Sequence, residues 1–134
     1  MSGFWENKSC LVTGATGFLG GFLVRSLLDQ GAEVVALVRD HIPHAQFHDD
    51  DILSQVKIIY GAIEDERTVA RAINEYACDT VFHLAAQAIV GVANREPVAT
   101  FKANIEGTWV VLEACRQIDT VERVIIASSD KAYG

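Results

Sequence analysis

Three glycines at a spacing of three residues, Gly14, Gly17 and Gly20, are the first residues that suggest a chemistry. They lie between an apolar run at 9–12, typical of a strand, and an apolar segment at 18–28, typical of a helix. The first glycine permits a tight turn, the second lets the backbone approach a pyrophosphate, and the third lets helix and strand pack closely. The N–H groups at the start of the helix then face the phosphates. The stretch predicts a dinucleotide site with contacts from Gly14, Thr16, Gly17, Phe18, Leu19 and Gly20.

The elements that must position this loop follow from further apolar runs. They predict strands at 32–38, 56–60, 80–84 and 121–127, with a long helix at 97–117 opened by Pro97. Gly31 and Asp65 stand where one helix should end and another should begin. The alternation predicts one α/β domain over residues 1–134. We expect a Rossmann-type, doubly wound parallel sheet with strand order 3-2-1-4-5 and helices on both faces.

In such a sheet a ligand lies at the carboxyl ends of the strands, where the order reverses between the first and fourth strands. Besides the glycine loop, the predicted cofactor contacts are Arg39 and Asp40 after the second strand, Ala62 and Ile63 after the third, Leu84, Ala85, Ala86 and Gln87 after the fourth, Ala127 at the end of the fifth, and Asn104 on the long helix. Ser129, Asp130 and Lys131 follow the last strand, where a reactive site belongs. Ser128 is equally compatible with a cofactor contact and with a hydrogen bond to the backbone at the strand end.

The chain has 134 residues, a net charge of −7 and a pI of about 4.9. This balance argues against nucleic acid or an anionic membrane as a partner. No stretch has the length of a membrane span, and the first eight residues lack a signal-peptide core. The cysteines, Cys10, Cys78 and Cys115, are odd in number and far apart. We therefore expect free thiols in a reducing compartment, the cytoplasm.

The histidines suggest other chemistries, but their context argues against them. His41, His44 and His48 have a spacing that suits a metal only on a helix, and Pro43 interrupts that helix. A polar surface loop is the better interpretation. His83 lies in a predicted central strand and is interpreted as a core histidine whose hydrogen bonds are satisfied.

The long helix at 97–117 is apolar on two sides. One stripe consists of Val98, Phe101, Ile105, Trp109 and Leu112, and the other of Val110, Val111, Ala114 and Ile118. Such a helix must be covered twice, by the sheet and by something else. Phe101 and Trp109 are interpreted as packing residues rather than as a stacking platform. The second stripe is the one that we expect to be partly exposed.

Taken together, several motifs resemble the extended short-chain dehydrogenase/reductase family of nucleotide-sugar enzymes. They are Thr13-Gly14-x-x-Gly17-x-x-Gly20, His83-Leu84-Ala85-Ala86, Asn104-x-x-Gly107-Thr108 with Leu112-Glu113-Ala114, and Ser128-Ser129-x-x-x-Tyr133-Gly134, and they cover essentially the whole chain. Within the family, Ser129-Asp130-Lys131 is most similar to the sugar-nucleotide 4,6-dehydratases, and its Asp-Lys pair to the CDP-glucose 4,6-dehydratases.

The resemblance implies an NAD(P)-dependent lyase that acts on a nucleotide sugar. In that chemistry hydride leaves C4 of the hexose, water is eliminated across C5 and C6, and hydride returns to C6. By carry-over, Ser129 hydrogen-bonds the C4 oxygen, Lys131 removes the C5 proton and Asp130 protonates the leaving C6 hydroxyl. If Asp130 and Lys131 are instead a solvated turn pair, a nucleotide-sugar epimerase or reductase remains, or a non-catalytic nucleotide-binding module.

The family also has a catalytic Y-x-x-x-K pair, which this sequence does not contain. We therefore expect the N-terminal part of a longer enzyme, ending before the sixth strand and the substrate-binding region. Such a part should bind cofactor but not turn over substrate. The resemblance further implies a homodimer that forms through the helix at 97–117.

Two departures from the family concern the choice of cofactor. Val38 stands where NAD-binding members have an acid. The adjacent Arg39 favours NADP through its 2′-phosphate, while Asp40 still suits the ribose of NAD. Ala62 stands where the family often has an aspartate that contacts adenine. This leaves only the backbone groups of Ala62 and Ile63 for that contact.

Overall fold

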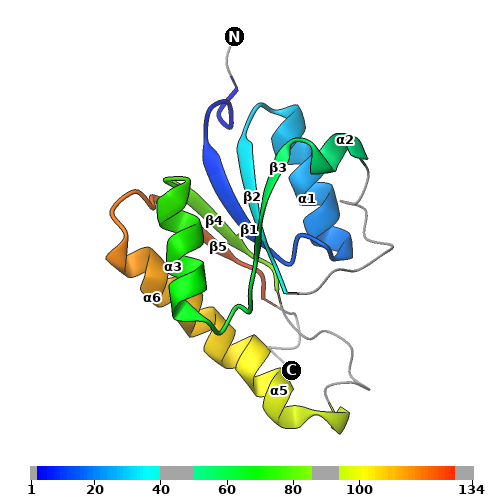
Figure 1. Ribbon diagram of the computed structural model, residues 1–134, viewed down its shortest axis with the longest axis vertical. Coiled ribbons are helices and arrows are strands. Elements are labelled where there is room, and N and C mark those ends of the chain that lie inside the picture. Colours follow the sequence, from blue (N-terminus) through cyan, green and yellow to red (C-terminus); the bar gives the residue numbers. More distant parts are fainter. Residues whose placement is uncertain (1–2, 40–49, 86–93, 129–134) are drawn as a thin grey trace.

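The computed structural model describes residues 3–39, 50–85 and 94–128. Within these ranges a parallel sheet has the predicted order β3-β2-β1-β4-β5 (Figure 1). Its strands are β1 (Ser9–Thr13), β2 (Glu33–Val38), β3 (Val56–Tyr60), β4 (Thr80–His83) and β5 (Arg123–Ile126). β5 starts later than predicted because the Val121 N–H turns back to the Ile118 carbonyl at 3.2 Å instead of joining the sheet.

The register of the sheet brings the last residues of the strands to one edge. Thr13, the last residue of β1, pairs with Leu37 of β2 on one side and with His83 of β4 on the other. His83 in turn pairs with Ile126, the last residue of β5. The loops after these strands therefore leave the sheet at one level, where the strand order reverses between β1 and β4.

Helices cover both faces of the sheet (Figure 1). They are α1 (Phe18–Asp29) and α2 (Asp50–Leu53) on one face, and α3 (Glu66–Glu75) and α6 (Gly107–Gln117) on the other. Alternate strand residues point to opposite faces, which sorts the core into two clusters. In β1, Leu11 packs in the cluster under α3 and α6, whereas Cys10 and Val12 pack in the cluster under α1 and α2.

The ends of α1 and α3 have the predicted capping residues. After α1, Gly31 has a φ of +86°. Its N–H bonds to the Leu28 carbonyl at 3.0 Å, and the Ala32 N–H bonds to the Leu27 carbonyl at 3.0 Å. This is the Schellman arrangement, which favours glycine. At the start of α3, the Asp65 carboxylate accepts hydrogen bonds from the Arg67 and Thr68 N–H groups.

The helix predicted at 97–117 is continuous but not uniform. It consists of α5 (Pro97–Phe101), a π-helical turn (Lys102–Glu106) and α6. The wider turn leads into Gly107, where a Cβ atom would lie 2.7 Å from Cγ2 of Ile63. The π-helical turn therefore comes directly before Gly107, the residue at which the helix backbone packs closely against Ile63 in the loop after β3. Neither this segment nor another helix in the described part of the chain is long and apolar enough to cross a membrane.

The prediction of which apolar stripe faces outward was wrong. Val110, Val111 and Ala114 are buried in the core with α3, and Ile118 packs against that core. The exposed stripe consists of Val98, Phe101, Ile105, Trp109 and Leu112. Phe101 and Trp109, interpreted as packing residues, are 61% and 59% exposed. Smaller side chains let α6 lie close to the sheet, which leaves the bulky residues outside.

Candidate dinucleotide-binding site

The glycine loop is held tightly by the chain around it. Gly14 has a φ of +75°, a conformation that favours glycine. A Cβ atom on Gly14 would lie 2.8 Å from the Ala85 nitrogen and from the Leu84 carbonyl carbon. A Cβ atom on Gly20 would lie 1.9 Å from the Gly14 oxygen. The first glycine therefore permits the turn, and the third permits close helix–strand packing, as predicted.

Gly17, the second glycine, stands in a more open place. It is the N-cap of α1, with a φ of −79° and a ψ of 175° that any residue adopts. A Cβ atom there would approach only the Gly14 oxygen, at 3.3 Å. In the described part of the chain no side chain caps this helix end, and its first turn holds no acidic residue. The exposed turn therefore offers backbone N–H groups and a positive dipole end, which fit an anionic phosphate group.

A buried polar cluster lies beside the loop, at the ends of β1 and β4. His83 Nδ1 is 2.7 Å from the Thr13 hydroxyl oxygen, and Nε2 is 3.2 Å from that of Thr108. The Thr13 oxygen also accepts the N–H groups of Leu84 and Ala85, each at 3.1 Å. His83 is thus the hydrogen-bonded core histidine that the sequence predicted. Its partners Thr13 and Thr108 were missed as polar residues of the site, although both lie in the motifs quoted above.

Other predicted contacts join this cluster. Thr108 donates its hydroxyl to the Asn104 carbonyl at 3.0 Å, and the Ala127 N–H bonds to the His83 carbonyl at 3.0 Å. Leu84, Ala85, Asn104 and Ala127 are therefore hydrogen-bonded either to His83 or to its partners Thr13 and Thr108. Asp40, Ala86, Gln87, Ser129, Asp130 and Lys131 lie outside the described residues, as do His41, His44 and His48.

The ends of β2 and β3 form the other side of the site. The Gly61 N–H bonds to the Val38 carbonyl at 3.0 Å, which joins the two strand ends. Arg39 lies 3.8 Å from a carboxylate oxygen of Glu64, and their side chains are 64% and 17% exposed. Glu64 was not among the predicted site residues. The sequence could have indicated Glu64, because it is an acid two positions after Ala62, and Ala62 replaces the acid that the family usually has.

The side chain of Ile63 is part of the protein core and is not available to contact a ligand. Its side chain is buried and packs beneath Gly107 at the start of α6. Only its backbone therefore remains for the predicted contact with adenine. Ala62 is half-buried, and its carbonyl accepts the Asp65 N–H at 3.1 Å.

The cysteines contribute no nucleophile. Cys10, Cys78 and Cys115 are free, as predicted, and all three are buried. Burial raises the pKa of the Cys10 thiol to about 12 and those of Cys78 and Cys115 to about 11. At neutral pH these thiols stay protonated and unreactive.

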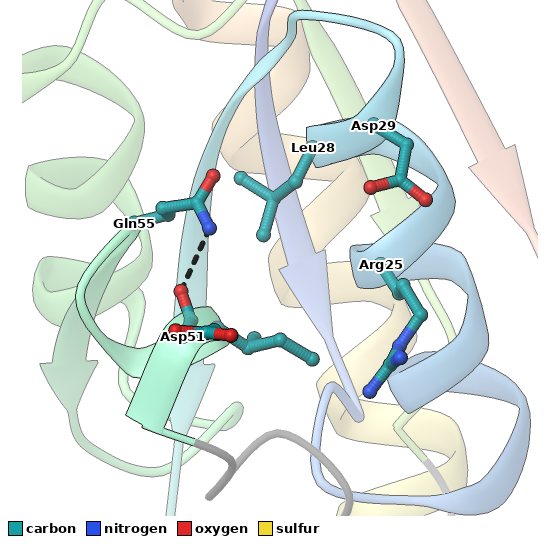
Figure 2. Close-up of a pocket in the computed structure, with 6 residues that line it drawn as sticks. Arg25, Leu28, Asp29, Asp51 and Gln55 are labelled. Atoms are coloured by element: carbon teal, nitrogen blue, oxygen red, sulfur yellow. Dashed lines mark hydrogen bonds between the residues drawn. The ribbon is translucent and has the colours of Figure 1, made fainter.

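A hollow of about 260 Å³ lies away from the glycine loop, between the last turns of α1 and α2 (Figure 2). Arg25 and Asp29 line it from α1, and Gln55 donates to the Asp51 carbonyl at 2.7 Å on the other side. It faces neither the helix N-terminus nor the strand ends that carry the predicted contacts. We assign it no part in the site.

The family model for the NAD dependent epimerase/dehydratase family matches residues 10–134, nearly the whole chain. The chain belongs to this family. The match spans the glycine loop, the His83 cluster and the strand ends, so the site described above is the one that the family model covers. Membership confirms the resemblance to this family, but not an individual reaction.

Similar proteins are named for several reactions, among them a dehydratase and an epimerase. The chain is 33% identical over 132 residues to CDP-glucose 4,6-dehydratase of Salmonella typhimurium, which covers 97% of this chain and 36% of the relative. It is 32% identical over 124 residues to UDP-glucose 4-epimerase of Halalkalibacterium halodurans, which covers 92% of this chain and 35% of the relative. The chain therefore spans about a third of these relatives, and the two reactions are matched about equally.

A solved family structure agrees with the fold. UDP-glucose 4-epimerase of Thermotoga maritima with UDP-glucose superposes with a TM-score of 0.80 and 33% identity, covering 94% of this chain and 40% of that one. The Rossmann-type sheet in the order 3-2-1-4-5 is thus shared with a nucleotide-sugar enzyme.

Proposed function

We propose that this chain is the dinucleotide-binding part of an NAD(P)-dependent nucleotide-sugar 4,6-dehydratase. The observation that carries the proposal is the open, uncapped start of α1 at Gly17, set in a chain of the epimerase/dehydratase family. The Ser129-Asp130-Lys131 motif favours the dehydratase over other family members. The three buried free thiols are consistent with an enzyme of the reducing cytoplasm.

In this proposal the residues of the chain have separate tasks. The backbone at Gly17, Phe18 and Leu19 holds the pyrophosphate of the dinucleotide. The bound dinucleotide supplies hydride acceptance and return. Lys131 removes the proton on C5 of the hexose and Asp130 protonates the leaving C6 hydroxyl, while Ser129 hydrogen-bonds the C4 oxygen.

The choice between NAD and NADP rests on Arg39. A guanidinium after β2 suits the 2′-phosphate of NADP, which favours NADP in this proposal. Glu64 already pairs with Arg39, so a 2′-phosphate must compete with a carboxylate for the same cation. The preference for NADP is therefore smaller than an unopposed arginine would give.

The exposed stripe of the long helix supports a homodimer. Val98, Phe101 and Trp109 line an apolar hollow of about 250 Å³ together with Ile105 and the side chains of Lys102 and Glu106. An apolar surface of this kind favours association. Sedimentation should show a dimer that Trp109→Glu converts to monomer, and a monomer at high concentration before mutation would contradict this assembly.

An epimerase is the second candidate, because UDP-glucose 4-epimerase is matched about as closely as the dehydratase. In the enzyme that contains this chain, Lys131→Ala should reduce dehydratase turnover by about 10²–10⁴-fold, the usual cost of losing a general base. It should slow C5 deuterium exchange as much as product formation. Asp130→Asn should preserve that exchange better than it preserves water loss. Full dehydration by Lys131→Ala, or a C4 epimer as the product, would favour the epimerase instead.

A further inference from the structure

His83 is enclosed by hydroxyl groups from two distant parts of the chain. The residue is 3% exposed and is the last residue of β4. Thr13 approaches it from the end of β1, and Thr108 approaches it from the start of α6, just after the π-helical turn. The pair formed with Thr13 spans 70 residues of sequence, and that formed with Thr108 spans 25.

The hydrogen bonds on the Thr13 side determine where a proton lies. A hydroxyl has one proton to donate and two lone pairs to accept with. The Ala85 N–H donates to the Thr13 hydroxyl oxygen at 3.1 Å, and the Leu84 N–H is shared between this oxygen and the Thr13 backbone carbonyl, each at 3.1 Å. The hydroxyl proton of Thr13 is then directed to Nδ1 of His83, 2.7 Å away, so Nδ1 accepts. This nitrogen therefore carries no proton.

The Thr108 side gives the same answer independently. The Thr108 hydroxyl donates to the Asn104 carbonyl at 3.0 Å, and a carbonyl only accepts. Its oxygen must then accept from Nε2 of His83, 3.2 Å away. Nε2 is therefore the protonated nitrogen. The Thr108 side selects the neutral Nε2–H form, and the donors around the Thr13 hydroxyl agree with it. The hydrogen bonds then run from Thr13 through the ring to Thr108 and the Asn104 carbonyl.

We propose that His83, held in its Nε2–H form between Thr13 and Thr108, is a positioning residue that sets the distance between the glycine loop and the helix turn bearing Asn104. The inference rests on the proposed dinucleotide site. β1 and β4 pair directly in the sheet, and the His83 ring links both of them to Thr108 at the start of α6. The loop after β4 is bonded to the same Thr13 hydroxyl oxygen. A shift of Ala85 would also displace Gly14, because the two backbones are so close that a Cβ atom on Gly14 would not fit between them.

Burial supports the same state of the ring, because desolvation lowers the pKa of His83. A protonated ring would present two donors. The Thr13 hydroxyl oxygen has two lone pairs, and it would then face three N–H donors, from His83, Leu84 and Ala85. The charged form is disfavoured by both the burial and the hydrogen bonds.

The first test reads the ring itself. Long-range proton–nitrogen correlation spectra of the ¹⁵N-labelled protein distinguish a protonated from an unprotonated ring nitrogen. The His83 signals are identified by their absence in His83→Gln. At neutral pH we expect Nε2 protonated and Nδ1 bare, and an Nδ1–H ring would overturn the inference.

The second test measures the effect on binding. Thr108→Val removes the acceptor at Nε2 with little change of shape. It should produce a mixed protonation pattern and weaken NAD and NADP binding by about three- to tenfold in calorimetry, the effect of one lost hydrogen bond. Thr108→Ser should restore both readouts. Thr80→Val, at the other end of β4 from His83, changes a threonine that is more deeply buried than Thr108, and it should change neither readout.

The outcomes separate this inference from the proposed function. If Thr108→Val changes the ring but leaves both affinities intact, His83 is a core residue with no positioning role. If its binding loss is matched by Thr80→Val, the effect is general destabilisation, and the inference fails. If the unaltered protein binds neither dinucleotide although the ring is Nε2–H, the proposed function fails, and the positioning role with it.

Discussion

The carboxyl edge of the sheet is built differently at its two ends. Around β1 and β4 the polar groups are uncharged and buried, with Thr13 1% and His83 3% exposed. At the ends of β2 and β3 the pair is charged and partly open, with Arg39 64% and Glu64 17% exposed. Buried neutral hydrogen bonds depend on geometry, whereas exposed charges depend on salt and on the charge of the partner. In the proposed function, the first end holds the dinucleotide by shape, and the second chooses between NAD and NADP by charge.

The largest expected effect tests the role of shape. Gly20→Ala places a Cβ atom 1.9 Å from the Gly14 oxygen, which forces the helix away from the loop. We expect a loss of about 3 kcal/mol in the free energy of unfolding, the upper part of the usual range for overpacking. Urea unfolding measures it. Gly17→Ala is the matched control in the same loop, and an equal loss there would show that close packing at Gly20 is not the cause.

The role of charge predicts a smaller effect with a different signature. Arg39→Ala should weaken NADP binding by about tenfold and leave NAD binding nearly unchanged, because a charge-assisted hydrogen bond contributes about 1.5 kcal/mol or more. Glu64→Gln should strengthen NADP binding by removing the competing carboxylate. Both effects should shrink at high salt. Equal changes for the two dinucleotides in calorimetry would remove Arg39 and Glu64 from cofactor selection.

The smallest effect concerns pH. Burial lowers the pKa of His83 below its ordinary value of 6.5, so the unfolded chain binds a proton that the folded chain does not. The contribution of His83 to stability is therefore complete above about pH 6.5 and is lost as the pH falls through the folded-state pKa. The slope is at most about 1.4 kcal/mol per pH unit. The contribution of His83 is the difference between the free energies of unfolding of the unaltered protein and of His83→Gln, measured in urea across pH. If both proteins lose stability equally with falling pH below 6.5, the burial of a neutral His83 ring is contradicted.

Features with a local cause could be predicted from the sequence. The positive φ of Gly14 and of Gly31, the close approach of Gly20 to Gly14 and the cap at Asp65 each depend on neighbours within a few residues. The strand order followed from the alternation of strands and helices, because few topologies satisfy right-handed crossovers.

Features that depend on distant packing could not be predicted. The helix at 97–117 has two apolar stripes of similar length, and only the sheet and α3 decide which one is buried. The π-helical turn also lies in a sequence with ordinary helical spacing. Neither periodicity nor spacing reveals the contacts between separate elements. Thr13 and His83 meet where β1 and β4 end together, Thr108 reaches His83 from the start of α6, and Arg39 meets Glu64 after β2 and β3.

The central claim is that the open start of α1 binds the pyrophosphate of a dinucleotide. The most direct test is calorimetric titration of the protein and of Gly17→Val with NAD and NADP. The dihedral angles of Gly17 suit any residue, and the near neighbour of a Cβ atom there is the Gly14 oxygen at 3.3 Å, a close contact that a valine must relax by a small shift. The variant should fold and melt like the unaltered protein but bind both dinucleotides at least about tenfold more weakly, a loss of about 1.4 kcal/mol. Unchanged affinity in a folded Gly17→Val protein would contradict the account.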